Sequence, residues 1–496
     1  MTTTRTHYNL SLLLILAFIF SLFLPLIDLG FTSDDYGLLC GIKENPFSLN
    51  FLFIPVNEHL VPFFRLVLSL EFSMFHYDAM FYYLVNIFLH LLNVLLTVFL
   101  IGSLTSNRII GLVAGLIFGA SAAHWRVPMW ITTQGQELAT FWMLVSSLLF
   151  LAFLKTKKAS CYFGSIISHL MMLFSFTDGF VYPLFVFLIY LLNATDTPDN
   201  KKLKWASIVT IPYLVNIMII LVLRGIFASS HGLLNSIGGI EGIFINLPSA
   251  VIFWLGGIFF LFIFPNTGGS ALIESLTFKG AIIYAALSFL ALIALQDRVN
   301  WKKIVKIITP LAFTAFLMIA IPIFPRLQWG FYWFVSRSRY AYSSGPLIAG
   351  CFAILISNIK LLKLDGKLFL KSILVTFLSL TLLLNIMFIV KKLDHIYKDW
   401  ITFNAAASNY LKHIRHLNLD EGARTYIVKR SLLNNYVDWN VDTELIVRTF
   451  IETPRRKSLS FINFEEIKFL DQNKDRVFWV DETGNLFKIN SFKGPK

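Results

Sequence analysis

Two adjacent carboxylates, Asp34 and Asp35, follow the first apolar run of the sequence, Leu10 to Ile27. Where a carboxylate is partly buried at the edge of a membrane, desolvation and the charge of a neighbouring acid raise its pKa toward the range that is useful for a general base at neutral pH. The doublet therefore predicts a general base for an incoming hydroxyl group, with Asp34 as the first candidate and Asp35 as the second. The alternative is a solvated loop start that only marks the membrane boundary.

Further polar residues follow in the next segment and in the next apolar run. His59 and Arg65 come after the doublet, and each could contact a substrate. Asn86, His90 and Asn93 are spaced to share one face of a helix, a face directed toward protein rather than lipid. Hydrogen bonds between helices explain this second group better than chemistry does.

In their order along the chain, these motifs resemble the GT-C superfamily of lipid-phosphosugar glycosyltransferases, and within it the protein O-mannosyltransferase-like branch. The segments that carry the resemblance are Asp34–Asp35, His59 with Pro62 and Arg65, Asn86 with His90, Ala123–Val127 with Gly135–Leu138, and Ser338–Tyr342. The sequence departs from the family at Arg126, where relatives often have an acid, and at Thr177–Asp178, where many have Lys-Glu. It also lacks the tetratricopeptide repeats that some members carry.

The resemblance implies transfer of a sugar from a polyprenyl-phosphate donor, undecaprenyl or dolichyl, to an extracytoplasmic hydroxyl, with inversion at the anomeric carbon. Such a donor also suits an active site outside the membrane, where nucleotide sugars are absent. Because a lipid phosphate is a weak base, the reaction needs a base for the acceptor and cations for the leaving phosphate, and no general acid. The acceptor could be a protein, a lipid or a glycan.

Arginine and histidine residues on the predicted outer side are candidates to bind the donor phosphate. Arg339 is the first, because a guanidinium group binds phosphate through two parallel hydrogen bonds, and His124 and Arg126 are the second. Alternatively, Arg337 and Arg339 are cations at the membrane edge that extend toward the headgroups. Two neighbouring carboxylates without further ligands nearby make a poor divalent site, so we expect that no metal or other cofactor is required. The alternative is that Asp34 and Asp35 are themselves ligands of a divalent metal.

The elements that must position these residues are membrane-spanning helices. Apolar residues make up 56% of the 496 residues and charged residues only 14%, about half the share of a soluble protein. This composition excludes a cytosolic enzyme, a nucleic-acid reader and a disulfide scaffold. The net charge of +13 comes from cations clustered between apolar runs, which is typical of the positive-inside rule.

The predicted fold is an all-α polytopic membrane protein of the GT-C type with a small extracytoplasmic α+β domain. The first run is an uncleaved span with Arg5 inside, and further runs lie at roughly 79–101, 109–125, 138–154, 160–176, 179–194, 205–223, 248–264, 280–295, 307–324, 345–359 and 372–391. Placing the cation clusters near 155–158, 201–204, 298–306 and 360–371 in the cytoplasm allows about 11 or 13 spans, of which we favour 11.

The domain organisation follows from the charge pattern. Residues 1–392 form the transmembrane domain, and within it 30–78 form an outer loop whose apolar stretch at 60–75 predicts an interfacial helix. Residues 393–496 form the outer domain, with a helix at 403–416, strands at 425–428 and 477–480, and a turn at 482–485. We expect a multi-pass protein of the bacterial inner membrane with its active site facing outward.

Two other functions compete with a glycosyltransferase. A transporter or flippase of lipid-linked sugars would carry ionisable residues at midspan or show internal repeats, and neither is apparent. A polysaccharide polymerase or ligase would concentrate its Arg and His residues in a large later loop. The partners expected are the lipid-linked donor, an acceptor of unknown kind and membrane lipid, without nucleic acid; a purely structural scaffold leaves Asp34 and Asp35 unexplained.

Overall fold

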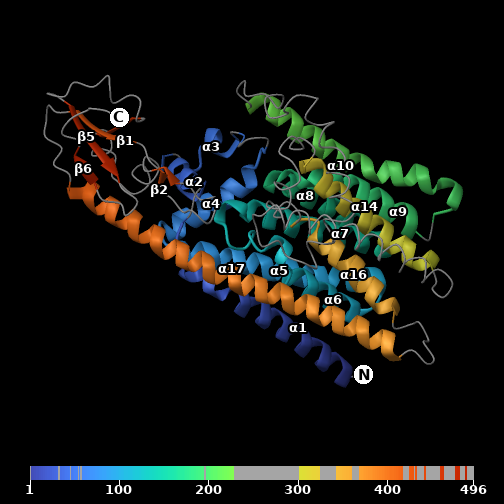
Figure 1. The fold of residues 1–496 in the computed structure, drawn as a ribbon. Helices are drawn as coiled ribbons and strands as arrows, with labels where there is room; N and C mark the ends of the chain where they lie inside the picture. The colour runs from blue at the N-terminus through green and yellow to red at the C-terminus, as the bar shows by residue number, and fades with distance from the viewer. Residues whose placement is uncertain are drawn as a thin grey trace, which may run out of the picture. The chain divides into compact units, whose positions relative to one another are not determined.

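The structure is a computed structural model, and it describes helices for most of its length (Figure 1). The described residues are 2–31, 34–44, 46–53, 55, 59–194, 197–227, 301–323, 342–359, 368–416, 424–428, 431–432, 441–442, 459–462, 475–480 and 486–488. The predicted spans at 248–264 and 280–295 and the turn at 482–485 lie outside these residues. Two compact units are present: Met1–Leu24 with Leu52–Val67 and Tyr83–Val390, and Pro25–Phe51 with Leu68–Tyr82 and Lys391–Lys496.

The first unit is built from apolar helices. They are α1 (Thr2–Phe23), α5 (Ala79–Thr105), α6 (Arg108–Gly119), α7 (Gln134–Thr156), α8 (Ala159–Ser175), α9 (Tyr182–Asn193), α10 (Asp199–Phe227), α14 (Trp301–Ile323), α16 (Gly345–Ile359) and the first part of α17 (Leu368–His416). Short 3-10 turns also occur: η1 (Leu24–Asp28), which belongs to the second unit from Pro25 on, and η2 (Ala122–His124), η3 (Ile131–Thr133) and η4 (Thr177–Val181) in the first unit. The first helix ends before Pro25, because proline disfavours the helical conformation of the residue before it.

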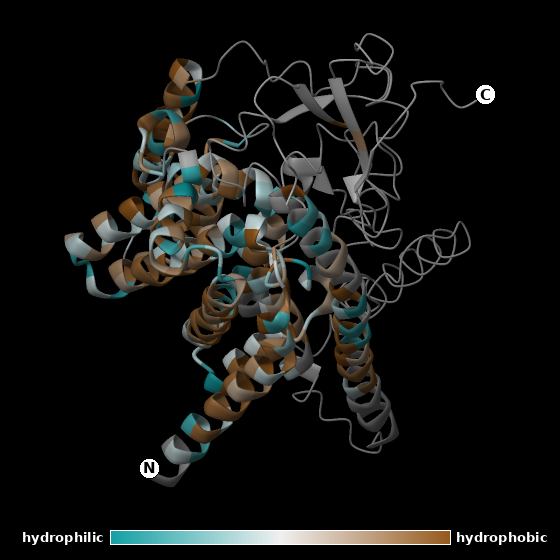
Figure 2. Ribbon diagram, turned by 90° about the vertical axis from the view of Figure 1, so that its left-hand side faces the viewer, coloured by the Kyte–Doolittle hydropathy of each residue, from teal (hydrophilic) through white to brown (hydrophobic). Residues whose placement is uncertain are grey.

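Four of the described stretches are long and apolar enough to cross a membrane: Thr6–Asp28, Ala79–Thr105, Ile131–Thr156 and Asp199–Phe227. Their outer faces expose large apolar side chains, such as Leu13 at 63%, Phe88 at 60% and Ile226 at 68%. Figure 2 shows the hydrophobic stretch of α1 beside the N-terminal label. So much exposed apolar surface requires lipid as the solvent, and the chain is an integral membrane protein. The total of 11 or 13 spans stays a prediction.

Small residues allow these helices to approach one another closely. Ser146 of α7 and Ser165 of α8 exchange hydrogen bonds, with their hydroxyl oxygens 2.9 Å apart, and the Tyr213 hydroxyl lies 2.7 Å from that of Ser165. On α6, Gly111, Gly115 and Gly119 follow one another at one-turn intervals and face α5 and α1, where an added Cβ would collide. These contacts are typical of helices that pack inside a membrane.

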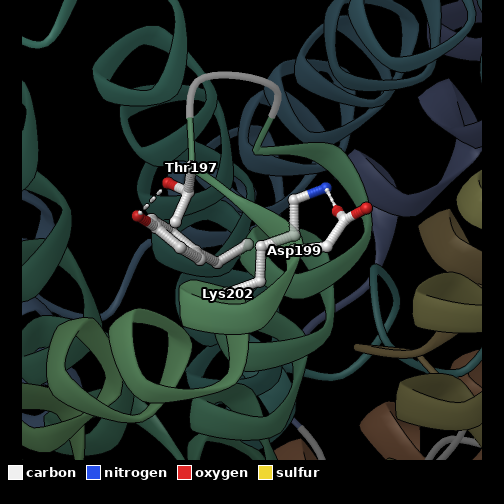
Figure 3. Close-up of polar contacts among 4 residues, drawn as sticks. Thr197, Asp199 and Lys202 are labelled. Atoms are coloured by element: carbon white, nitrogen blue, oxygen red, sulfur yellow. Dashed lines mark hydrogen bonds and ion pairs between the residues drawn. The ribbon is translucent and has the colours of Figure 1, made fainter.

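The start of α10 carries one of the predicted cytoplasmic cation clusters, near 201–204, and Figure 3 shows Lys202 of this cluster. Lys202 Nζ lies 2.7 Å from Asp199 Oδ1 in the first turn of α10, and the hydroxyls of Tyr190 and Thr197 are 3.0 Å apart. The side chain of Asp199 is 92% exposed, so this ion pair contributes little to stability. It does place an acid at a helix N-terminus, where the helix dipole favours negative charge.

The second unit combines short helices with a sheet. Its helical parts are α2 (Asp34–Glu44), α3 (Leu49–Phe53, whose last two residues belong to the first unit), the later part of α4 (Pro62–Phe75), the first four residues of α5 and the part of α17 from Lys391. The four-stranded sheet has the order β4 (Leu459–Ile462), β1 (Arg424–Val428), β5 (Asp475–Val480), β6 (Leu486–Lys488), with β1 parallel to both neighbours. A separate pair, β2 (Ser431–Leu432) and β3 (Val441–Asp442), is antiparallel. The strands expected at 425–428 and 477–480 are confirmed as β1 and β5.

One helix runs through the predicted domain boundary at 392–393. α17 continues for 49 residues, so the last predicted span and the predicted helix at 403–416 are parts of the same element. No glycine or proline interrupts the sequence from Leu368 to His416, which removes the usual reasons for a helix to stop. At 1.5 Å per residue its length is about 74 Å, more than twice the apolar thickness of a membrane.

Candidate active site

The aspartate doublet lies in the first turn of α2, and its two members differ in burial. Asp34 is exposed, whereas Asp35 is only 1% exposed. Consecutive residues of a helix point about 100° apart, so one of two neighbours can enter the core while the other faces solvent. Both carboxylates lie where the helix dipole stabilises negative charge.

Tyr36 follows the doublet and is also buried. Burial raises the pKa of Tyr36, and the negative charge of Asp35 raises it further. The phenol therefore keeps its proton at neutral pH and remains a hydrogen-bond donor. Around Asp35 the second unit thus offers a water-poor environment next to an accessible acid.

Arg65 occupies α4, the helix expected to lie at the interface. A helix does form there, beginning at Pro62, which suits the first helical position. Arg65 and Glu71 are only 4% and 5% exposed, so the two charges face protein and not headgroups. Burial lowers the pKa of Arg65 to about 10, which leaves the guanidinium charged at neutral pH.

His59 meets the loop between α8 and α9, in the first unit. Its ring stacks on Phe176, with centroids 4.3 Å apart and planes at 26°, and its Nδ1 lies 2.9 Å from Thr177 Oγ1. Asp178 comes next in the same turn and is 2% exposed. Burial raises the pKa of Asp178 to about 6, although the hydroxyl of Ser343 and the charge of His59 both lower it.

In the sequence, Asp178 stands out only as a departure from the family pattern. The signal that could have found it is the one that pointed to Asp34: an acid between two apolar runs on the predicted outer side. Its neighbours could not be found in this way, because His59 precedes Thr177 by 118 residues.

The polar stripe of α5 bonds to other elements, which confirms the interpretation as contacts between helices. His90 Nδ1 lies 2.8 Å from the Tyr342 hydroxyl and Nε2 lies 3.1 Å from the Gly119 carbonyl. A carbonyl only accepts, so Nε2 carries the proton and Nδ1 accepts from the tyrosine. Asn93 donates to the Glu137 carbonyl at 3.0 Å, and Asn86 donates to the Pro128 carbonyl at 3.4 Å.

The remaining candidates are placed only in part. The Arg126 guanidinium lies over the neighbouring Trp125 ring, 5.4 Å from its centroid. His124 lies in η2, but its side chain is outside the described residues, as is all of Arg339. The structure therefore brings His59 together with Thr177 and Asp178, whereas Asp34 and Asp35 belong to the other unit.

No metal centre is apparent in the described part of the chain. Within it, no three His, Cys, Asp or Glu side chains come together as ligands. The three cysteines, Cys40, Cys161 and Cys351, carry free thiols. Independence of metal stays a prediction from the sequence.

Comparisons with known proteins give matches in structure only. No family model matches the chain. No characterised protein matches it by sequence. Among solved structures, the chain is similar to the oligosaccharyltransferase AglB of Archaeoglobus fulgidus in complex with an inhibitory peptide and a dolichol-phosphate, at 12% identity and a TM-score of 0.49, over 86% of this chain and 62% of that one.

A second similarity is with ArnT of Cupriavidus metallidurans bound to undecaprenyl phosphate, at 13% identity and a TM-score of 0.46, over 97% of this chain and 94% of that one. The chain spans less than two thirds of the archaeal protein. The archaeal protein is an oligosaccharyltransferase, and each of the two structures holds a lipid phosphate. At these identities and TM-scores, activity has to be argued from the residues of this chain itself.

Proposed function

We propose that this protein is a membrane glycosyltransferase, which moves a sugar from a polyprenyl-phosphate donor to an acceptor hydroxyl on the extracytoplasmic side. The observation that carries the proposal is the acidic doublet in the first turn of α2, with one carboxylate exposed and the other buried. An exposed acid can reach a substrate, and the burial of its neighbour means that protein excludes water on one side of the doublet. The membrane helices place the protein in the lipid bilayer, which is the solvent in which a lipid-linked donor arrives.

The proposed reaction is a single displacement. Asp34 takes the proton of the acceptor hydroxyl while the hydroxyl oxygen attacks the anomeric carbon. The bond from that carbon to the phosphate oxygen breaks, and its electron pair leaves with the lipid phosphate, so the anomeric configuration inverts. Asp34 is assigned as the base because a general base has to touch the proton that it removes, and Asp35 supports it from the core.

Cations are needed where the phosphate charge develops. Arg339 is our first candidate, by the resemblance of its Arg-Tyr segment to the family. Arg126, His124, His59 and Arg65 lie on the same predicted side, and Arg65 keeps its charge although it is buried. A guanidinium or imidazolium group that meets the leaving phosphate lowers the barrier most in a site that excludes water.

The test is a transfer assay in detergent with undecaprenyl- and dolichyl-phosphate sugars, read as release of free lipid phosphate. We expect Asp34→Asn to slow release by about 100-fold or more, the usual contribution of a general base, with donor binding unchanged. Asp28→Asn is the control, because Asp28 is an exposed acid a few residues upstream and should be dispensable. A fully active Asp34→Asn variant would remove the assignment.

Two further readings of the same assay separate the alternatives. A flippase would move the lipid-linked sugar across a vesicle membrane without releasing lipid phosphate. Transport without release would therefore show that the protein is a transporter and not a glycosyltransferase. Activity that survives exhaustive chelation is expected, because the doublet has no further ligands close in sequence. Activity that is lost on chelation and restored by a divalent ion would indicate that Asp34 and Asp35 are metal ligands.

A further inference from the structure

The segment at 120–133, between α6 and α7, is irregular apart from two short 3-10 turns, and most of it is buried. Ser121, Val127 and Trp130, for example, all lie in the interior. The preceding helix α6 has 12 residues and is therefore about 18 Å long, less than the apolar thickness of a membrane, which is about 30 Å. Because lipid offers no hydrogen bonds, the backbone groups of this segment have to find their partners in the protein.

Side chains of two other helices supply such partners at the start of the segment. His90 Nε2 of α5 donates to the carbonyl of Gly119, the last residue of α6, at 3.1 Å. The backbone amide of Ala122 donates to Asn385 Oδ1 of α17 at 2.9 Å, across 263 positions of the sequence. The segment is thus attached both to α5 and to α17 just before Trp125 and Arg126.

A second side chain of α17 meets the same segment. Phe388 packs edge-on against Trp125, with the ring centroids 6.2 Å apart and the planes at 75°. Asn385 and Phe388 are three residues apart, so they share one face of α17, and both are buried. From Leu382 to Val390 Asn385 is the one polar residue, and it faces protein, whereas Met387 on another face is 58% exposed. This part of α17 therefore uses one face to hold the segment.

Arg126 depends on these contacts for its position. It is partly exposed, whereas its neighbours Trp125 and Val127 are buried. Its guanidinium lies over the Trp125 ring, 5.4 Å from the centroid, and a cation is attracted to the face of an indole ring. Phe388, Trp125 and Arg126 thus form a series of contacts that begins at α17 and ends at a cation.

We propose that Asn385 and Phe388 of α17 are positioning residues for Arg126. Asn385 fixes the backbone at Ala122 and Phe388 fixes the ring of Trp125, and together they hold the guanidinium in place. The consequence for a lipid phosphate rests on the proposed function, in which Arg126 is one of the candidate cations. A cation that is held before its ligand arrives loses less rotamer freedom on binding, which favours affinity. The two residues of α17 act through the segment and are assigned no contact with the substrate.

The first experiment measures the attachment of the backbone and requires no substrate. Hydrogen–deuterium exchange in detergent, followed by mass spectrometry of overlapping peptides around Ala122, reports how well its amide is protected. We expect Asn385→Leu to raise the exchange rate of this amide by about tenfold, because it removes the acceptor of a buried hydrogen bond. Asn385→Asp keeps an acceptor oxygen at the same place, and Met387→Leu changes an exposed face, so both should stay within about twofold of wild type. Equal exchange in Asn385→Leu and wild type would overturn the inference.

The second experiment tests whether α17 acts through Arg126. The affinity for undecaprenyl phosphate and for dolichyl phosphate is measured by titration calorimetry in a double-mutant cycle. We expect Asn385→Leu and Phe388→Leu each to weaken binding by about tenfold in wild type but by less than about twofold in Arg126→Gln, because residues that act as a unit are not additive.

A general structural role would weaken binding equally in the two backgrounds, and that result would contradict the positioning of Arg126. Thermal stability shows which variants are folded, and the cycle can be completed with either of the two α17 variants. Met387→Leu is again the control and should bind as wild type does.

The two experiments also separate this inference from the proposed function. Faster exchange at Ala122 in a protein that binds neither lipid phosphate and transfers no sugar would keep the attachment to α17 and remove the glycosyltransferase. Equal losses in both backgrounds of an active glycosyltransferase would remove the positioning alone.

Discussion

At the scale of single residues, burial distinguishes acids that look alike in the sequence. Asp34 and Asp35 are neighbours, but only Asp35 enters the core, and Asp178, which no strong motif marks, is as deeply buried as Asp35. A carboxylate in the interior is destabilised in its charged form, and nearby donors and cations only partly compensate. A buried acid of this kind is a candidate for a functional role, and Asp35 and Asp178 are such candidates in separate units of the protein.

The first prediction concerns Asp178 and pH. Because its pKa rises from 3.8 to about 6 on folding, the protonated form is favoured in the folded protein. Stability associated with this group is complete below pH 3.8 and is lost as the pH rises toward 6, by about 3 kcal/mol. Thermal unfolding in detergent between pH 4 and 7 should therefore show a decline in wild type that Asp178→Asn lacks.

A parallel decline in the two proteins would show that Asp178 is not the titrating group. His59 and Ser343 are the neighbours to vary next, since both lower its pKa. The neutral side chain of Ser343 cannot titrate in this range, so Ser343→Ala should change the position of the decline without abolishing it.

At the scale of elements, α6 illustrates how the helices are held together. Its glycines at 111, 115 and 119 face Val98, Val94 and Ile19, and at Gly111 the neighbour is the backbone of α5. A side chain can move aside, but the backbone of a buried helix cannot without disturbing its hydrogen bonds. The close approach of α6 to the backbone of α5 therefore depends on the absence of a side chain at Gly111.

The second prediction compares two glycines in helices. Gly111→Ala should lower the free energy of unfolding by about 1–3 kcal/mol, because the added methyl group meets the backbone of α5 near Val98. Gly225→Ala is the matched control, since in the described part of the chain no atom beyond its own helix backbone lies within 4 Å of its Cβ position, and alanine favours a helix. Thermal stability measured by loss of monodisperse protein on heating should fall for the first variant only. Equal stability would mean that α5 and α6 pack less closely than described.

At the scale of the whole molecule, the predicted orientation decides whether the site can meet its donor. The connections that carry Asp34, His59 and Asp178 are on the outer side if the lysine clusters are inside. A lipid-linked sugar is the activated donor available there. The positions of the lysine clusters along the sequence thus predict the orientation of the protein, and the orientation in turn predicts a lipid-linked donor.

The third prediction tests this orientation with a membrane-impermeant thiol reagent. Asp78 precedes α5 and Lys158 precedes α8, and both are exposed. With the partly exposed Cys161 replaced by serine, Asp78→Cys should react in intact cells, and Lys158→Cys only after the membrane is opened. The reverse pattern would place the doublet in the cytoplasm and remove the argument for a lipid-linked donor.

The sequence by itself determined what depends on composition and local pattern. Apolar runs predict membrane helices because lipid leaves no other way to satisfy the backbone, and alternating residues at 425–428 and 477–480 predict strands because side chains in a strand point to opposite faces. The acidic doublet could also be found from the sequence, because charged residues are rare in such an apolar chain.

Only the tertiary structure decided which groups meet. The burial of Asp35 and not Asp34 depends on how α2 packs, and the contact between His59 and Thr177 joins residues that are 118 positions apart. The uninterrupted course of α17 through 393–402 also escaped prediction, because the charges there resemble a boundary although nothing in the backbone ends the helix. Local rules act over a few residues, whereas burial and long-range contacts are properties of the assembled chain.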